Sequence, residues 1–168
     1  MRRNVYWALM VTIAALLEAS WPGVLRIQGV MPDLILLMVV YFAIAGGSER
    51  AMITGLAGGL LQDVAGDTGL GHHVLSLAIV GYLAGSISLR LVTDPPAVKS
   101  GLVLAAGLLN GILFVAVSYL QDPGMNVLNT VAVSVVPRSF YTALVTPFVF
   151  YLLQRSRPPG HPAPGWQV

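Results

Sequence analysis

Long apolar runs fill most of this 168-residue chain and constrain its fold more than any other feature. In the stretch Pro32–Gly85, one apolar run opens on Pro32-Asp33, a second ends on Gln62-Asp63, and a third contains Gly81–Gly85. Charged residues make up only 10% of the chain, whereas a soluble domain has about 25%. Because the charges fall mostly between the apolar runs, the sequence predicts an all-α integral membrane protein.

Several classes of function are excluded or disfavoured by the residues present. The chain has no cysteine, which excludes disulfides and thiol chemistry. Its Lys and Arg residues form no basic stripe, so we expect no nucleic-acid binding. No nucleophile–base pair and no pair of intramembrane catalytic carboxylates is recognisable, so we expect neither an enzyme nor a cofactor. His72 and His73 are adjacent and do not share a helix face; we expect loop histidines and no metal site.

Six transmembrane helices account for the apolar runs, and together they predict one transmembrane domain over residues 1–154. The spans cover about 5–20, 34–45, 51–62, 73–91, 100–120 and 127–153. A tight turn over Gly46–Arg50 separates the short second span from the third. The sixth region contains Pro137, which predicts either a kink or a separate interfacial or re-entrant piece over 127–136. The Pro-rich residues 155–168 are expected to form a cytoplasmic tail.

The placement of Lys and Arg sets the orientation of the spans. Six spans put both termini on one side, and assigning that side to the cytoplasm leaves only Arg26 and Arg138 outside or in the outer half. The other basic residues are cytoplasmic: Arg2, Arg3, Arg50, Arg90, Lys99, Arg155 and Arg157. This distribution follows the positive-inside rule and predicts cytoplasmic N- and C-termini.

Three predicted spans carry glycines four residues apart, a spacing that lets helix backbones approach closely in lipid. The pairs are Gly55 and Gly59, Gly81 and Gly85, and Gly107 and Gly111. They predict that the third, fourth and fifth spans form a tight central layer. Small-residue faces and the short second span are also possible surfaces for a partner helix. Asn110 in the fifth span is expected to form a hydrogen bond between helices.

Four charged residues lie near or inside apolar runs, all in the outer half of the predicted layout. They are Glu18, Asp33, Asp63 and Arg138. An ionised group in hydrocarbon costs at least about 2.5–3.5 kcal/mol, so each requires a partner or water. We therefore predict that Arg138 pairs with Asp33 or Asp63. Two interpretations stay open: a polar cavity or partner site open to the outer side, or helix-end solvation with one structural salt bridge.

The stretch Pro32–Gly85 resembles the MreD family of rod shape-determining proteins. The resemblance is carried by Pro32-Asp33 before an apolar span, by G-L-A-G-G-L-L-Q-D ending at Asp63, by the turn Gly69-x-Gly71, and by V-G-Y-L-A-G ending at Gly85. Structural or partner-binding roles are expected for ten residues of these motifs and the last span: Pro32, Asp33, Gly55, Gly59, Asp63, Gly69, Gly71, Gly81, Gly85 and Arg138.

The resemblance implies a non-catalytic scaffold in the bacterial inner membrane, within the machinery that elongates the lateral cell wall. Such a protein binds the single-span protein MreC. Through MreC it associates with the actin-like MreB, the RodA glycosyltransferase and a class B penicillin-binding transpeptidase. The resemblance also implies kinship in fold with the substrate-binding subunits of energy-coupling-factor vitamin transporters. Vitamin transport is accordingly the alternative function, and it would require an outward pocket lined by polar or aromatic side chains.

Overall fold

The elements of the described part of the chain are all helices. The computed structural model describes residues 2–20, 30–66, 71–90, 95–121, 123–124 and 126–155, with side chains from residue 5 onward. Its elements are α1 (Arg2–Ala19), α2 (Leu34–Ala65), α3 (His72–Ser88), α4 (Pro96–Gln121), α5 (Val127–Thr130), the π-helical η2 (Val131–Val135) and α6 (Val136–Arg155). Most of the predicted tail, residues 156–168, lies outside the described residues.

Three of the described helical stretches are long and apolar enough to cross a membrane: Leu34–Ala65, Pro96–Gln121 and Val127–Arg155. Two further apolar helices, Val5–Ala19 and His72–Ser88, are shorter. The sequence predicted six spans. By their length and composition, three helices of the described ranges qualify as membrane spans. One cause of the difference is that the predicted spans 34–45 and 51–62 both fall within α2.

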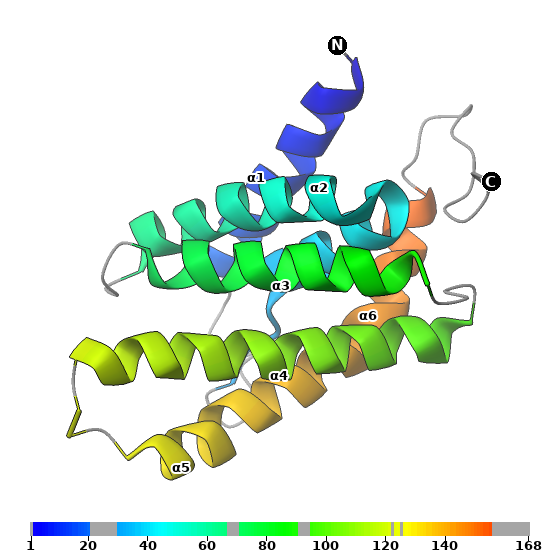
Figure 1. Ribbon diagram of the computed structural model, residues 1–168. Helices are drawn as coiled ribbons and strands as arrows, with labels where there is room; N and C mark the ends of the chain where they lie inside the picture. Colours follow the sequence, from blue (N-terminus) through cyan, green and yellow to red (C-terminus); the bar gives the residue numbers. More distant parts are fainter. Residues whose placement is uncertain are drawn as a thin grey trace.

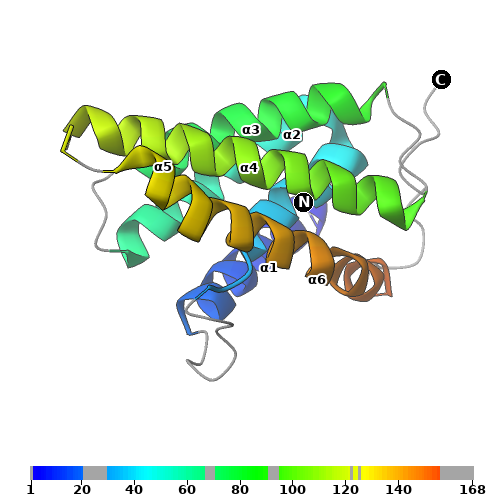
Figure 2. The same ribbon diagram turned by 90° about the horizontal axis from the view of Figure 1, so that it is seen from below.

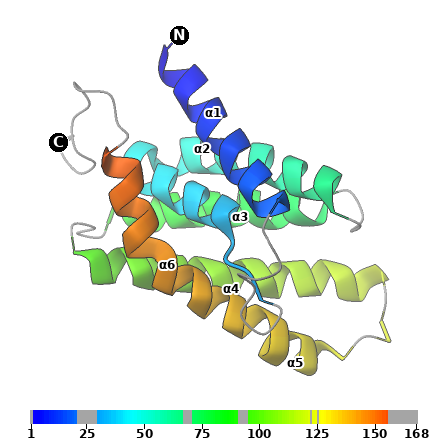
Figure 3. The same cartoon turned by 180° about the vertical axis from the view of Figure 1, so that it is seen from behind.

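Gly47 divides α2 into two arms, residues 34–46 and 48–65. Its backbone has φ 77° and ψ −172°, a non-helical conformation inside the element that is essentially reserved for glycine. The two arms leave this residue in different directions (Figures 1 and 3). The turn expected at Gly46–Arg50 is therefore a single break at glycine, after which helix resumes at once.

The first arm of α2 forms the centre of the protein. All residues from Leu34 to Ala43 are buried, as expected for a helix that is apolar on every side. Its side chains pack with Leu77 of α3, Val103 of α4 and Phe150 of α6. Around it, the second arm, α3 and α4 run side by side in Figure 1, while α1 and α6 cover the opposite side in Figure 3.

The second arm of α2 and α3 pack backbone against backbone. A Cβ atom on Gly55 would overlap the Leu77 carbonyl, and one on Gly59 would overlap the backbone of His73 and Val74. From α3, Gly81 meets Ala51 and Gly85 meets Ser48 in the same way. These four glycines therefore allow two antiparallel helices to approach more closely than larger side chains permit.

The third glycine pair contacts a different neighbour from the one predicted. Gly107 faces Ser139 of α6 and Leu36, and Gly111 faces Val135 of η2. The predicted close packing through glycines is thus confirmed between the second arm of α2 and α3. It is wrong for α4, whose glycines pack toward α6 and η2. Glycine spacing predicts a close-packing face, but it does not determine which helix occupies that face.

Residues 127–155 form one continuous helical run that bends. The segment Val131–Val135 is π-helical, and the Val136 N–H donates to the Val131 carbonyl. Pro137 follows this segment after one intervening residue and has no N–H to donate. The π-helical turn therefore lies next to the position where a regular helical hydrogen bond is lost. Residues 127–136 therefore lead into α6 without a break, and Figure 2 shows α5 and α6 as parts of the same bent path.

Candidate functional site

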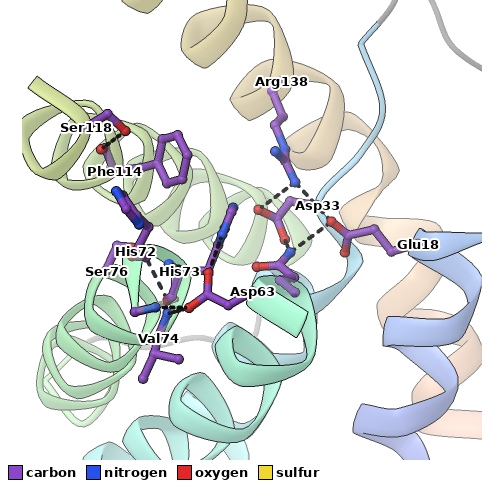
Figure 4. A network of polar contacts seen from close by, with 12 residues as sticks. Glu18, Asp33, Asp63, His72, His73, Val74, Ser76, Phe114, Ser118 and Arg138 are labelled. Atoms are coloured by element: carbon purple, nitrogen blue, oxygen red, sulfur yellow. Dashed lines mark hydrogen bonds and ion pairs between the residues drawn. The ribbon is translucent and has the colours of Figure 1, made fainter. Parts of the chain in front are cut away.

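Arg138 joins two carboxylates between α1, α2 and α6. Its Nη2 lies 3.0 Å from Glu18 Oε1 and 3.3 Å from Asp33 Oδ2 (Figure 4). The prediction that Arg138 pairs with Asp33 or Asp63 is confirmed for Asp33. Glu18, which the sequence placed in the same polar group, is the nearer of the two partners.

Asp33 is held by its position at the beginning of α2. Its Oδ1 accepts a hydrogen bond from the Leu36 N–H at 2.8 Å, the usual geometry of a helix N-cap. The Asp33 N–H donates to Thr142 Oγ1 at 3.0 Å, and Thr142 in turn donates to the Arg138 carbonyl at 2.7 Å. Pro32, fully buried, precedes the cap. Asp33 therefore lies at the positive end of the α2 dipole.

Glu18 reaches the same helix end from the last turn of α1. Its Oε2 accepts from the Ile35 N–H at 3.2 Å, and its Oε1 accepts from Gln62 Nε2 at 2.9 Å. The Gln62 amide also lies 3.5 Å from Asp33 Oδ1, which is a weak contact. We name the group Glu18, Asp33, Gln62 and Arg138 the polar junction, because it connects α1, both arms of α2, and α6.

Charge and burial show why the polar junction is stable within an apolar bundle. The side chains of Asp33 and Glu18 are only 4% and 10% exposed, and that of Arg138 is 37% exposed. Two carboxylates face one guanidinium, and the N–H groups at the start of α2 stabilise the remaining negative charge. Every carboxylate oxygen has a donor. This geometry favours the structural salt bridge over an open polar cavity.

Asp63 forms a second polar contact, separate from Arg138, at the start of α3. Its Oδ2 accepts from the N–H groups of Gly71 at 2.7 Å and Val74 at 3.3 Å. Its Oδ1 accepts from the His73 N–H at 3.0 Å and lies 2.9 Å from His73 Nδ1. Gly71 has φ 105°, a left-handed conformation. Asp63 thus caps α3 from the preceding helix; Gly69 lies outside the described residues.

The two histidines are helical rather than in a loop, which corrects the expectation for them. Both lie in the first turn of α3, and their rings contact Phe114 of α4, with centroids 5.8 Å away for His72 and 4.7 Å for His73. Among the described residues, no group of three or more His, Cys, Asp or Glu is placed to hold a metal ion. Their visible role is to pack α3 against α4.

Sequence reasoning missed some members of these contacts. Gln62 was noted only as the end of an apolar run, although a polar amide in apolar sequence beside Asp63 was a usable signal. Thr142 stands four residues after Arg138, where a helical hydroxyl can reach the earlier carbonyl. Asn110 is buried in α4, and its Oδ1 has no hydrogen-bond partner in the described ranges. This oxygen therefore contributes no hydrogen bond between helices among the described residues.

The chain was compared with known protein families, with curated proteins and with solved structures. The family model described as rod shape-determining protein MreD matches residues 1–156. Neither the curated proteins nor the solved structures give a match. The matched range includes every helix described above, the polar junction, and the cap at Asp63.

Proposed function

Because the chain belongs to the MreD family of rod shape-determining proteins, we propose that it is a non-catalytic adaptor in the bacterial inner membrane. In this function it binds MreC and helps to maintain rod cell shape. Through MreC it associates with RodA, a class B penicillin-binding transpeptidase and MreB. The family match over residues 1–156 is the observation that carries the proposal.

The proposed topology has six membrane-embedded segments: α1, the two arms of α2, α3, α4 and the run 127–155. The first arm has thirteen residues, about 20 Å at roughly 1.5 Å per residue, which is short for a bilayer crossing. It is supported by neighbours on all sides, since Leu34–Ala43 is buried by protein. Both termini are cytoplasmic in this proposal. Kinship in fold with energy-coupling-factor subunits stays a prediction, since no solved structure matches.

The chemistry of the described polar groups supports an adaptor. The polar junction and the cap at Asp63 use their carboxylates to fasten helices to one another. The glycine faces of the second arm of α2 and of α3 are likewise occupied within the chain. We propose structural roles for these residues. A partner helix then docks on the larger apolar side chains that are exposed, such as Leu9 on α1 and Leu144 on α6.

The alternative function, vitamin binding for transport, gains no specific support. The family match favours shape determination, and the polar junction satisfies its own carboxylate oxygens. A vitamin-binding subunit would require polar side chains that converge on an outward pocket. We therefore retain the adaptor as the single proposed function.

Co-purification tests this proposal. The chain is expressed with affinity-tagged MreC from the same organism, and the membranes are extracted in a mild detergent. We expect the chain to elute with MreC in a fixed ratio, and we expect rod shape to be lost when the chain is depleted. Failure to elute with MreC, together with unchanged cell shape on depletion, would overturn the adaptor function.

A further inference from the structure

The basic residues of the described ranges are strongly segregated. Apart from Arg138 in the polar junction, all of them lie at one end of the helical bundle. The sequence has no Lys or Arg between Arg50 and Arg90, nor between Lys99 and Arg138. These two stretches contain the helix ends at the opposite side, where α2 leads to α3 and α4 leads to α5.

Helix packing brings the basic residues to that common end. Arg50 lies just after the break in α2, and the contact of Gly85 with Ser48 places the end of α3, and hence Arg90, beside it. Lys99 lies near the start of α4, which packs antiparallel to α6, so Arg155 at the end of α6 lies at the same side. In Figure 1 the end of α3, the start of α4 and the end of α6 all lie toward the right.

The direction of α1 adds two more basic positions to this end. Trp7 Nε1 donates to Thr54 Oγ1 at 2.8 Å, while Glu18 contacts Gln62 further along the same arm of α2. Helix α1 therefore crosses this arm obliquely, with its N-terminal part toward Thr54 and its last turn toward Gln62 (Figures 1 and 3), and its first turn, with Arg2 and Arg3, belongs to the end of α1 that is nearer to the basic end. We name Arg50, Arg90, Lys99 and Arg155 the basic rim.

Large apolar side chains adjoin the basic rim. Next to Arg90, Ile87 is 47% exposed and Leu89 is 74% exposed. One turn before Arg155, Tyr151 is 63% exposed, and tyrosine favours the boundary between headgroups and acyl chains. A basic residue directly above exposed apolar surface fits a phospholipid, which offers an anionic headgroup above acyl chains. An acidic protein segment in water would complement only the basic charges and would leave the exposed apolar side chains in water.

We propose that the basic rim binds the headgroups of anionic phospholipids in the cytoplasmic leaflet. The proposal rests on the membrane orientation given with the proposed function. The basic rim contains four cations, and Glu49 is the acidic residue beside them in the described ranges. Each Lys or Arg near an anionic membrane surface strengthens binding about five-fold. Three neutralised rim residues therefore reduce binding of an anionic lipid by roughly 100-fold.

Native mass spectrometry of the full chain in detergent tests this inference with two probes, phosphatidylglycerol and phosphatidylcholine. The wild type is compared with Arg90→Gln/Lys99→Gln/Arg155→Gln. We expect the wild type to prefer phosphatidylglycerol by more than tenfold, and the triple variant to lose this preference while binding phosphatidylcholine as before. The matched variant Arg90→Lys/Lys99→Arg/Arg155→Lys keeps every charge and should keep the preference. Glu49→Gln should preserve or increase it.

A salt titration on the wild type makes the test independent of how well the triple variant folds. Raising ionic strength from about 0.1 M to about 1 M shortens the screening length from about 10 Å to about 3 Å, and it should weaken phosphatidylglycerol binding selectively. Equal binding of both lipids by the wild type would overturn the inference. So would binding of soluble poly-glutamate without any preference for phosphatidylglycerol. Co-elution with MreC, measured on the same preparations, reports separately on the adaptor function.

Discussion

Arg138 Nη2 lies 3.0 Å from Glu18 Oε1, so the first turn of α6 is fastened to the last turn of α1 across 120 residues of sequence. The same nitrogen contacts Asp33, the N-cap of α2. A single guanidinium thus connects the first helix of the chain, the buried central arm and the last helix. Because these charges lie among apolar helices, the contacts are expected to set helix positions as well as stability.

Replacing Arg138 by Gln should destabilise the protein by about 1–3 kcal/mol. Removing one partner of a buried pair costs about 3–5 kcal/mol because it leaves the other charge unpaired, and the partial exposure of Arg138 reduces this cost. Reversible unfolding in mixed micelles measures the change. The exposed Arg90→Gln is the control and should change stability by less than about 0.5 kcal/mol.

The double variant Glu18→Gln/Arg138→Gln tests whether the loss comes from the ion pair. The double variant should lose less free energy of unfolding than the two single variants lose in sum, because the charged carboxylate of Glu18 is then no longer left without its cationic partner. Strict additivity of the two single changes would show that Glu18 and Arg138 do not interact, and it would contradict the polar junction.

Replacing Asp63 by Ala should loosen the start of α3 in particular. The carboxylate accepts hydrogen bonds from the N–H groups of Gly71, His73 and Val74, and the loss of one N-cap alone costs about 1 kcal/mol. We expect a loss of about 2 kcal/mol, with faster hydrogen exchange at the His73 and Val74 amides. The control is Asn126→Ala, which removes the exposed cap of α5; it should cost less and leave exchange in α3 unchanged.

Part of this structure follows from the sequence on physical grounds. The pairing of Arg138 with Asp33 or Asp63 was predictable, because a lone cation in an apolar run must find one of few anions; the choice of Asp33 was not. The break at Gly47 was predictable from the glycines and polar residues of the turn. The close packing of Gly55, Gly59, Gly81 and Gly85 was predictable from their spacing alone.

Other contacts depend on helix rotation and tertiary order, which local patterns do not contain. Glycine spacing could not show that Gly107 and Gly111 face α6 and η2 rather than α3. The positions of Glu18 and Gln62 in one junction depend on how α1 crosses the second arm of α2. The helical placement of His72 was missed because the cap that begins α3 comes from Asp63, in the last turn of the preceding helix, and not from a residue next to His72.

Replacing Gly81 by Ala should cost about 1–3 kcal/mol, because the added methyl group would meet the backbone of Ala51 and force α2 and α3 apart. Thermal unfolding in detergent measures the effect. Gly101 in α4 provides the matched control, since a Cβ there meets nothing within 4 Å. Gly101→Ala should be neutral or stabilising by up to about 1 kcal/mol, as alanine favours helix. Equal effects at both positions would argue against the close helix contact.

Single-cysteine labelling of α4 tests most directly whether this chain is a membrane adaptor with the proposed topology. The chain has no cysteine, so Ala97→Cys and Gln121→Cys each introduce one thiol, at opposite ends of α4. A membrane-impermeant maleimide applied to intact spheroplasts should label the variant at position 121. The variant at position 97 should react only after permeabilisation. Labelling of both positions from outside, or of position 97 alone, would rule out the proposed topology.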